Sequence, residues 1–246
     1  MTMDDAVEGV LQTQAVNELL TARALIGVSS GVSLVATVAM LLCFLGFQES
    51  RRCGRRLLFC LHLADAGAAC AWLLVFAQPS RALRDADMGL LITEAVPSTP
   101  PLCYAQAYLL LFFMLASSLW TACFAFHLFQ ILGKAGKTPE LYEARYHLVA
   151  WGVPLFTVLH LGLQQALGYN LVGESGLPWC WLRTWSDYEW APSGMYFQVS
   201  VFYGPLLLVL LHNLSTYFSL LYKLVKIITC LFVSGLGLTV VVNPAK

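Results

Sequence analysis

The chain has 246 residues, of which 59% are hydrophobic and only 11% are charged, and its formal net charge is zero. An ordinary soluble domain carries about 25% charged residues, so the composition excludes that class, and the zero balance excludes the overall basic field of a nucleic-acid-binding protein. The apolar runs are about 20 residues long and do not alternate, which favours membrane-spanning helices over a β-barrel. We therefore predict an all-α membrane protein that buries its apolar surface in a lipid bilayer.

The predicted elements begin with a polar, slightly acidic segment over residues 1–23. It lacks the basic start and apolar core of a cleavable signal peptide and is too short for a folded domain, so we expect a short extracellular segment. Predicted membrane helices follow over residues 24–47, 57–77, 103–132, 147–167 and 195–222. Residues 227–242 are apolar but short for a span of about 20 residues, so we expect residues 223–246 to form an atypical apolar tail.

Lysine and arginine in the short links indicate the orientation of these helices, because basic links are retained in the cytoplasm. They concentrate after the first, third and fifth predicted helices: Arg51, Arg52, Arg55, Arg56, Lys134, Lys137, Arg145, Lys223 and Lys226. All three segments fall on one side of the membrane. We predict that this side is cytoplasmic and that the amino terminus lies outside.

Cys103 and Cys180 are then both predicted on the outer side, each at or near the end of a long apolar segment. They are the only cysteines predicted outside, where an oxidising environment allows disulfides to form. We expect a bridge that pins the loop containing Trp179-Cys180-Trp181 to the start of the third helix. Two unpaired thiols are the alternative. This arrangement points to a cell-surface receptor rather than a soluble enzyme.

Several short motifs resemble one group of membrane receptors. They are Arg55-Arg56-Leu-Leu-Phe-Cys-Leu-His-Leu-Ala-Asp65, Ser117-Ser118-Leu-Trp120-Thr121, Trp151-Gly-Val-Pro154 and Trp179-Cys-Trp181. The third helix ends in His127-Leu-Phe-Gln-Ile-Leu132 and lacks the Asp-Arg-Tyr of rhodopsin-like receptors. Over residues 24–222 the chain is similar to the cyclic-AMP-receptor-like branch of the G-protein-coupled receptors, which is related to the secretin (family 2) receptors. The order and spacing of the motifs look closest to an orphan animal receptor of that branch.

The resemblance implies a seven-helix receptor in the plasma membrane, or in the membrane of a cilium. It implies an extracellular ligand, which remains unknown, and a heterotrimeric G protein as the cytoplasmic partner, with no cofactor or metal and no nucleic acid. Because five helices are found, helices 6 and 7 are expected to be missing and the bundle to be truncated after helix 5. In the family, helix 6 moves on activation, so such a chain is not expected to signal in the usual way.

Asp65 stands out among the candidate functional residues, because an ionisable group at mid-depth in a membrane helix is costly. With His62 one turn before it, Asp65 could organise a polar or sodium-binding network, or it could be a protonated acid bonded to a neighbouring helix. Other polar and aromatic side chains in the outer half could line a ligand pocket: Trp72, Tyr108, Gln164, Tyr196 and Ser200. The alternatives are an aromatic belt and interhelical hydrogen bonds. The basic residues could contact G protein or anionic lipid, or could set topology alone.

Two other function classes remain as alternatives to a receptor. A transporter or channel would show inverted repeats and several buried charges, and we find neither. An accessory membrane protein that pairs with a full-length receptor and modulates it is the second alternative. Enzyme signatures such as HExxH, paired CxxC, a nucleophile elbow or a glycine-rich dinucleotide fingerprint are absent from the sequence, and the histidines show no paired metal-ligand spacing, so an enzyme is disfavoured.

Overall fold

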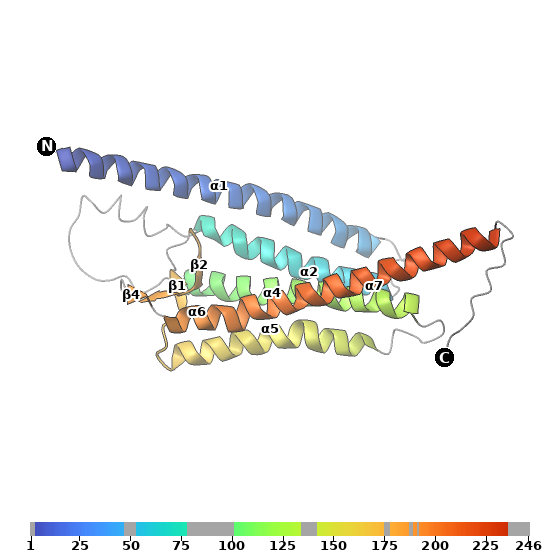
Figure 1. The fold of residues 1–246 in the computed structure, drawn as a ribbon. Helices are drawn as coiled ribbons and strands as arrows, with labels where there is room; N and C mark the ends of the chain where they lie inside the picture. The colour runs from blue at the N-terminus through green and yellow to red at the C-terminus, as the bar shows by residue number, and fades with distance from the viewer. Residues whose placement is uncertain are drawn as a thin grey trace.

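The computed structural model of the protein describes residues 3–46, 53–77, 101–133, 142–174, 178–186, 189–190 and 192–235. Its long helices form one elongated bundle, with a small pair of strands at the end where the first helix begins (Figure 1). Within the described residues, five helical segments are long and apolar enough to cross a membrane: Val16–Gly46, Gly54–Ala77, Pro101–Ile131, Glu143–Ala166 and Gly194–Phe232. The prediction of an all-α membrane bundle is confirmed.

The helical elements include two short turns that are not α-helical, one after α2 and one between α6 and α7. In chain order, these elements are α1 (Met3–Gly46), α2 (Cys53–Leu73) with the 3₁₀ turn η2 (Leu74–Ala77), α4 (Pro101–Gly133), α5 (Glu143–Ala166), α6 (Pro192–Gln198), the π-helical turn η4 (Val199–Tyr203) and α7 (Gly204–Gly235). Helix α4 contacts α2, α5 and α7, and α1 packs on α2 (Figure 1). The bundle is therefore organised around α4.

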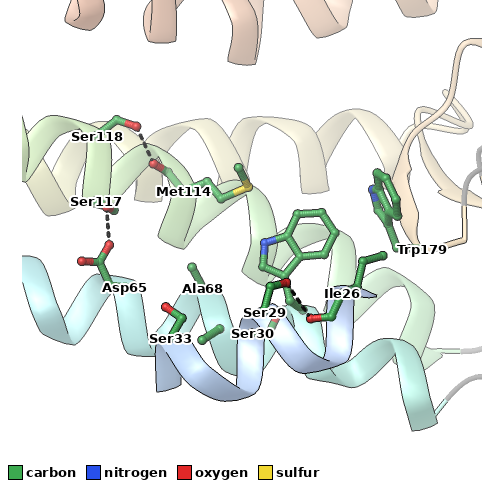
Figure 2. A pocket seen from close by; sticks show the side chains of 12 residues that line it. Ile26, Ser29, Ser30, Ser33, Asp65, Ala68, Met114, Ser117, Ser118 and Trp179 are labelled. Atoms are coloured by element: carbon green, nitrogen blue, oxygen red, sulfur yellow. Dashed lines mark hydrogen bonds between the residues drawn. The ribbon is translucent and has the colours of Figure 1, made fainter. Parts of the chain in front are cut away.

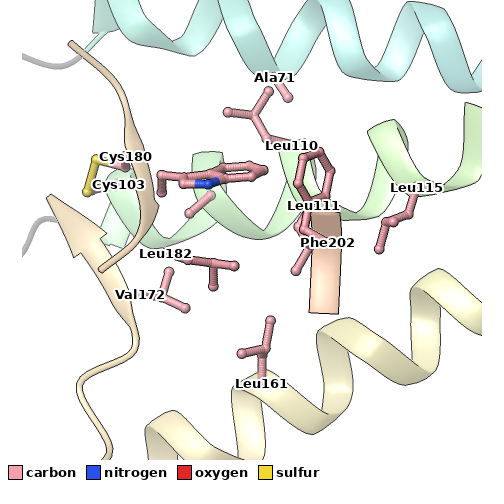
Figure 3. Close-up of a cluster of buried hydrophobic side chains, with 12 residues drawn as sticks. Ala71, Cys103, Leu110, Leu111, Leu115, Leu161, Val172, Cys180, Leu182 and Phe202 are labelled. Atoms are coloured by element: carbon pink, nitrogen blue, oxygen red, sulfur yellow. A yellow bond between two sulfur atoms is a disulfide. The ribbon is translucent and has the colours of Figure 1, made fainter. Parts of the chain in front are cut away.

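Two clusters of buried side chains divide the bundle along α4. The hairpin core, at the end with the strands, includes Ala71, Leu110, Leu111, Leu161, Trp181 and Phe202 (Figure 3). The far core includes Leu57, Ala64, Ala116, Trp120 and Ala150. Both clusters draw on α2, α4 and α5, so the same three helices are held together at both ends.

Both terminal helices are longer than predicted. α1 begins at Met3 rather than near residue 24, and the segment suited to crossing a membrane begins at Val16. The predicted boundary was wrong because polarity marks where a helix leaves lipid and not where it ends; the acidic Asp4 and Asp5 suit a helix amino terminus. The extracellular placement of residues 1–23 stays a prediction.

The predicted end of the last helix at Tyr222 was also wrong, because α7 continues to Gly235. Lys223 and Lys226 are good helix formers, and no glycine or proline follows Pro205 until Gly235. Residues 223–235 of the predicted apolar tail are thus a continuation of α7. The remaining residues, 236–246, lie outside the described part of the chain.

The π-helical turn η4 lies directly before Gly204-Pro205. Pro205 has no N–H to donate to the preceding turn, and its ring needs space there, which a wider turn provides. A Cβ on Gly204 would lie 2.8 Å from the carbonyl oxygen of Val199. A residue without a side chain is therefore required next to the proline.

Two antiparallel strand pairs occupy the segment between α5 and α6, for which the sequence predicted a loop but no strands. β1 (Val172–Glu174) pairs with β2 (Cys180–Leu182), with Gly173 opposite Trp181. β3 (Trp185–Ser186) pairs with β4 (Glu189–Trp190). Val172, Cys180, Trp181 and Leu182 are all buried, so the β1–β2 hairpin is packed into the end of the bundle.

Close packing of α2 on α4 gives a first test. A Cβ on Gly67 would lie 2.4 Å from the ring of Phe113, whereas a Cβ on Gly31 of α1 would meet no atom within 4 Å. We expect Gly67→Ala to lower the free energy of unfolding by about 1–3 kcal/mol through overpacking. Gly31→Ala should be neutral or up to about 1 kcal/mol stabilising, because alanine favours helix.

The measurement is unfolding in mixed micelles by sodium dodecyl sulfate, followed by circular dichroism. If the Gly67→Ala protein is as stable as the Gly31→Ala protein, the packing of α2 on α4 is wrong.

Candidate functional site

The hairpin is attached covalently to the start of α4. Cys103 and Cys180 form a disulfide, with their Cα atoms 5.3 Å apart, and both residues are buried. Figure 3 shows the bond beside the strands. The bridge predicted from the sequence is confirmed. The free cysteines of the described residues include Cys60 and Cys123, which lie in or against the far core.

Glutamine side chains provide further attachment of the hairpin, which the sequence did not predict. Gln165 of α5 accepts hydrogen bonds at Oε1 from the backbone N–H groups of Leu171 (3.1 Å) and Val172 (3.2 Å), where β1 begins. Gln198 of α6 donates from Nε2 to the carbonyl oxygen of Leu182 in β2, at 2.7 Å. The hairpin is thus held by side-chain amides from separate helices.

The two tryptophans on either side of Cys180 contact different parts of the bundle. The Trp181 ring meets the Phe202 ring edge-on, with centroids 5.0 Å apart, inside the hairpin core. The Trp179 ring meets the Trp72 ring of α2, also edge-on, with centroids 5.1 Å apart. Aromatic pairs at these separations stabilise beyond their buried area. The hairpin therefore closes over α2 on one side and fills the centre of the bundle on the other.

A cleft of about 510 Å³ lies between α1, α2 and α4. Small and polar side chains line most of it, and Trp179 lies at its hairpin end (Figure 2), where its ring meets that of Trp72. The lining residues are Ile26, Ser29, Ser30, Ser33, Asp65, Ala68, Ala69, Trp72, Met114, Ser117, Ser118 and Trp179. Asp65 is the single ionisable side chain among them.

Asp65 is joined to α4 by a short hydrogen bond. Ser117 donates from Oγ to Asp65 Oδ1 at 2.5 Å, across the gap between α4 and α2 (Figure 2). His62 Nδ1 lies 4.0 Å from Asp65 Oδ2, which is too long for a hydrogen bond. The sequence suggested His62 as the partner because residues three apart share a helix face. The hydrogen-bonding partner is instead Ser117 of α4, and the sequence alone does not give the rotation of α4 against α2.

The structure brings one of the five predicted pocket residues, Trp72, to the cleft. Tyr108 is half-buried against the hairpin core, and Gln164 is half-buried on α5. Tyr196 is 70% exposed, and Ser200 is exposed and donates from Oγ to the carbonyl oxygen of Phe197 in its own helical segment. Tyr196 and Ser200 share a face directed away from the bundle. A pocket role for these four residues stays a prediction.

An ion pair lies at the end of the bundle opposite the hairpin. Arg56 of α2 and Glu143 of α5 are 2.7 Å apart and form a hydrogen-bonded pair. Arg55 is exposed, and the Lys223 ammonium lies 3.7 Å from the centre of the Phe129 ring on α4. Arg145 of α5 and Lys226 of α7 are also exposed, whereas Arg51, Arg52, Lys134 and Lys137 lie outside the described residues. Three helices therefore present cationic groups at this end.

No group of three histidine, cysteine, aspartate or glutamate side chains within the described ranges is placed to hold a metal ion. What the site offers is a carboxylate–hydroxyl pair in a polar cleft, with aromatic rings and a bridged hairpin above it. This arrangement suits noncovalent recognition of a small molecule between helices.

A sequence profile described as the slime mold cyclic AMP receptor matches residues 71–233, which include α4, α5 and most of α7. The chain belongs to this receptor family. It is 32% identical over 194 residues to G-protein coupled receptor 1 of Arabidopsis thaliana, covering 78% of this chain and 49% of that protein. It is 26% identical over 196 residues to cyclic AMP receptor-like protein A of Dictyostelium discoideum, covering 80% of this chain and 44% of that protein.

The order of the sequence motifs resembled that of an animal receptor, and the chain is similar to one. The chain is 29% identical over 166 residues to human G-protein coupled receptor 157, covering 67% of this chain and 42% of that protein. The chain thus spans about half the length, or less, of the relatives named here. Their names place the family among receptors rather than enzymes. They support the G-protein-coupled receptor group as a whole and not its secretin branch.

The Ser117–Asp65 hydrogen bond gives a second test. Ser117→Ala removes the donor to Asp65 and should lower the free energy of unfolding by about 1–3 kcal/mol. Ser118→Ala is the matched control, since Ser118 Oγ bonds only the carbonyl oxygen of Met114 in its own helix, and it should change stability by about 0.5 kcal/mol or less.

A double-mutant cycle with Asp65→Ala, measured by the same detergent unfolding, should give a coupling of about 1 kcal/mol between residues 65 and 117. Equal effects of the two serine substitutions, or additive effects in the cycle, would contradict the assignment.

Proposed function

We propose that the protein is a signalling receptor that binds an extracellular ligand and acts on a heterotrimeric G protein. Its membership of the cyclic AMP receptor family, over residues that run from the end of α2 to α7, is the observation that supports this most strongly. The bridged hairpin at one end and the cationic groups at the other agree with a receptor that faces two compartments. Within the wider group, the motifs Ser117–Thr121 and Trp151–Pro154 favour the secretin-related (family 2) side.

The proposed orientation places the amino terminus and the hairpin outside the plasma membrane. Arg55, Arg56 and Lys223 lie at the end opposite the hairpin, and basic residues near span ends favour the cytoplasm. The Cys103–Cys180 bridge then lies on the side where disulfides persist. The basic end would meet the G protein and the headgroups of anionic lipids.

The proposed ligand region is the cleft below Trp72 and Trp179. Asp65 and Ser117 form the polar network at its floor, and a cation such as sodium is one ligand for the Asp65 carboxylate. Among the described residues, the lining includes this carboxylate and no lysine or arginine. Such a surface disfavours an anion, so a cyclic nucleotide, which the names of several relatives specify, is not the ligand we propose for this cleft. A neutral or cationic small molecule fits better.

The proposed mechanism is a shift between two arrangements of the helices. A ligand that binds one arrangement more tightly than the other changes their populations by its differential affinity. The hairpin is tied to α4 and touches α2, α5 and α6, so contact at the hairpin reaches most of the bundle. The G protein would respond at the opposite end.

Orientation is tested by placing epitope tags at the two ends of the chain. A tag before Met1 should bind antibody on intact cells, and a tag after Lys246 should bind only after the membrane is permeabilised. The expectation follows from the five candidate spans of the described residues, an odd number, with basic residues kept inside. Antibody access to both tags, or to the carboxyl-terminal tag alone, on intact cells would refute the orientation.

Coupling is tested by energy transfer between a luciferase after Lys246 and a fluorescent γ subunit of a heterotrimeric G protein. Transfer should saturate with acceptor and should fall when GTPγS is added to permeabilised cells, because nucleotide binding dissociates a receptor–G protein complex. The same luciferase on an unrelated membrane protein is the control. Transfer that rises linearly with acceptor and ignores GTPγS would argue against coupling.

A further inference from the structure

Gln106 is a polar side chain fully buried in the middle of the hairpin core. Its exposed fraction is 0%, and it lies three residues after Cys103, on the same face of α4. A buried amide is unfavourable unless its oxygen and its nitrogen are hydrogen-bonded. A leucine would fill the same place without that cost. The partners of the amide therefore indicate what it does.

Both ends of the Gln106 amide are bonded, and they are bonded to different elements. Oε1 accepts a hydrogen bond from the backbone N–H of Cys180 in β2 at 3.1 Å. Nε2 donates to the backbone carbonyl oxygen of Ala71 in α2 at 3.3 Å. A single side chain on α4 thus joins the hairpin to α2.

Both backbone groups lie where the regular hydrogen-bond pattern of their helix or strand pair ends. α2 ends at Leu73, so the Ala71 carbonyl belongs to its last turn, where the α-helical acceptor pattern stops. Cys180 and Leu182 alternate with Trp181 along β2. The backbone N–H and C=O groups of Cys180 and Leu182 therefore point toward the helices rather than toward β1. Gln106 accepts a hydrogen bond from the N–H of Cys180, and Gln198 donates one to the carbonyl oxygen of Leu182. Amides from the bundle thus bond an edge of β2 that pairs with no other strand among the described residues.

We propose that Gln106 is a second latch for the β1–β2 hairpin, which positions the hairpin on α2 and α4 independently of the Cys103–Cys180 disulfide. A disulfide joins two side chains and leaves the strand free to turn about that joint. The Gln106 bond fixes the backbone of the same residue, Cys180, and so fixes the direction of β2. Trp179 is thereby held against Trp72 at the end of the cleft. The latch does not depend on the proposed receptor function.

The test measures how fast a phosphine reductant opens the Cys103–Cys180 bridge in the purified, micelle-bound protein, by mass spectrometry of trapped thiols. The bridge is buried, so reduction requires the hairpin to lift. Gln106→Leu should speed reduction about tenfold, since it leaves two buried backbone groups without their partner. Gln106→Glu should have a smaller effect, because the retained oxygen still accepts from Cys180. Gln130→Leu, a half-buried glutamine lower on α4, is the control and should match the wild type.

The protein contains its own reporter of general loosening. Cys123 is buried in the far core, and its rate of maleimide labelling should be the same in all four proteins. The latch is refuted if Gln106→Leu reduces no faster than Gln130→Leu. It is equally refuted if labelling of Cys123 accelerates in step with reduction of the bridge.

Independence from the bridge is tested in a Cys103→Ser, Cys180→Ser protein by trypsin cleavage after Arg183, directly following β2. The bridge-free protein should resist cleavage there, and adding Gln106→Leu should make it susceptible. If removal of the bridge alone gives the full cleavage rate, Gln106 does not hold the hairpin without the bridge and the proposal fails. If the leucine variant does not fold, Gln106→Glu gives the same comparison with a smaller expected increase in cleavage, because its oxygen still accepts from Cys180 while the donor to Ala71 is lost.

Discussion

The structure depends on the close approach of α2, α4 and α5. In lipid, helices gain no hydrophobic free energy by leaving a solvent as apolar as themselves, so they associate through tight packing and hydrogen bonds. Alanines supply the tight packing here: Ala64 on α2, Ala116 and Ala125 on α4 and Ala150 on α5 are all fully buried. Because these side chains are short, Trp120 and the leucines of both cores can fill the remaining space.

Asp65 and the Arg56–Glu143 pair lie around this packing rather than within it. The Ser117–Asp65 bond lies at the edge of the α2–α4 contact and opens on the cleft, while the Arg56–Glu143 pair closes the far end. A carboxylate at this depth is costly in hydrocarbon and is retained where it has a donor and a polar surrounding. The serines of α1 provide that surrounding. The cleft is thus the polar side of an otherwise apolar bundle.

Hydropathy predicted the helices well because the membrane itself imposes the pattern. It failed at the start of α1 and at the end of α7, since the backbone can stay helical after the chain leaves lipid. The disulfide was predictable because topology left two cysteines outside together. The partner of Asp65 was not, because the choice between His62 and Ser117 depends on the rotation of α4 against α2. The glutamine contacts were not predictable either, since their partners are backbone atoms outside the helix that carries each glutamine.

The attachments of the hairpin share one chemical property. Gln106, Gln165 and Gln198 are neutral amides, and the covalent joint beside them carries no charge either. Salt screens charges and pH titrates them, but neither acts strongly on an amide–backbone hydrogen bond. The opposite end relies on an arginine–glutamate pair and a lysine over an aromatic ring. One end of the molecule is therefore built to hold its shape in a variable ionic medium, and the other to respond to charge.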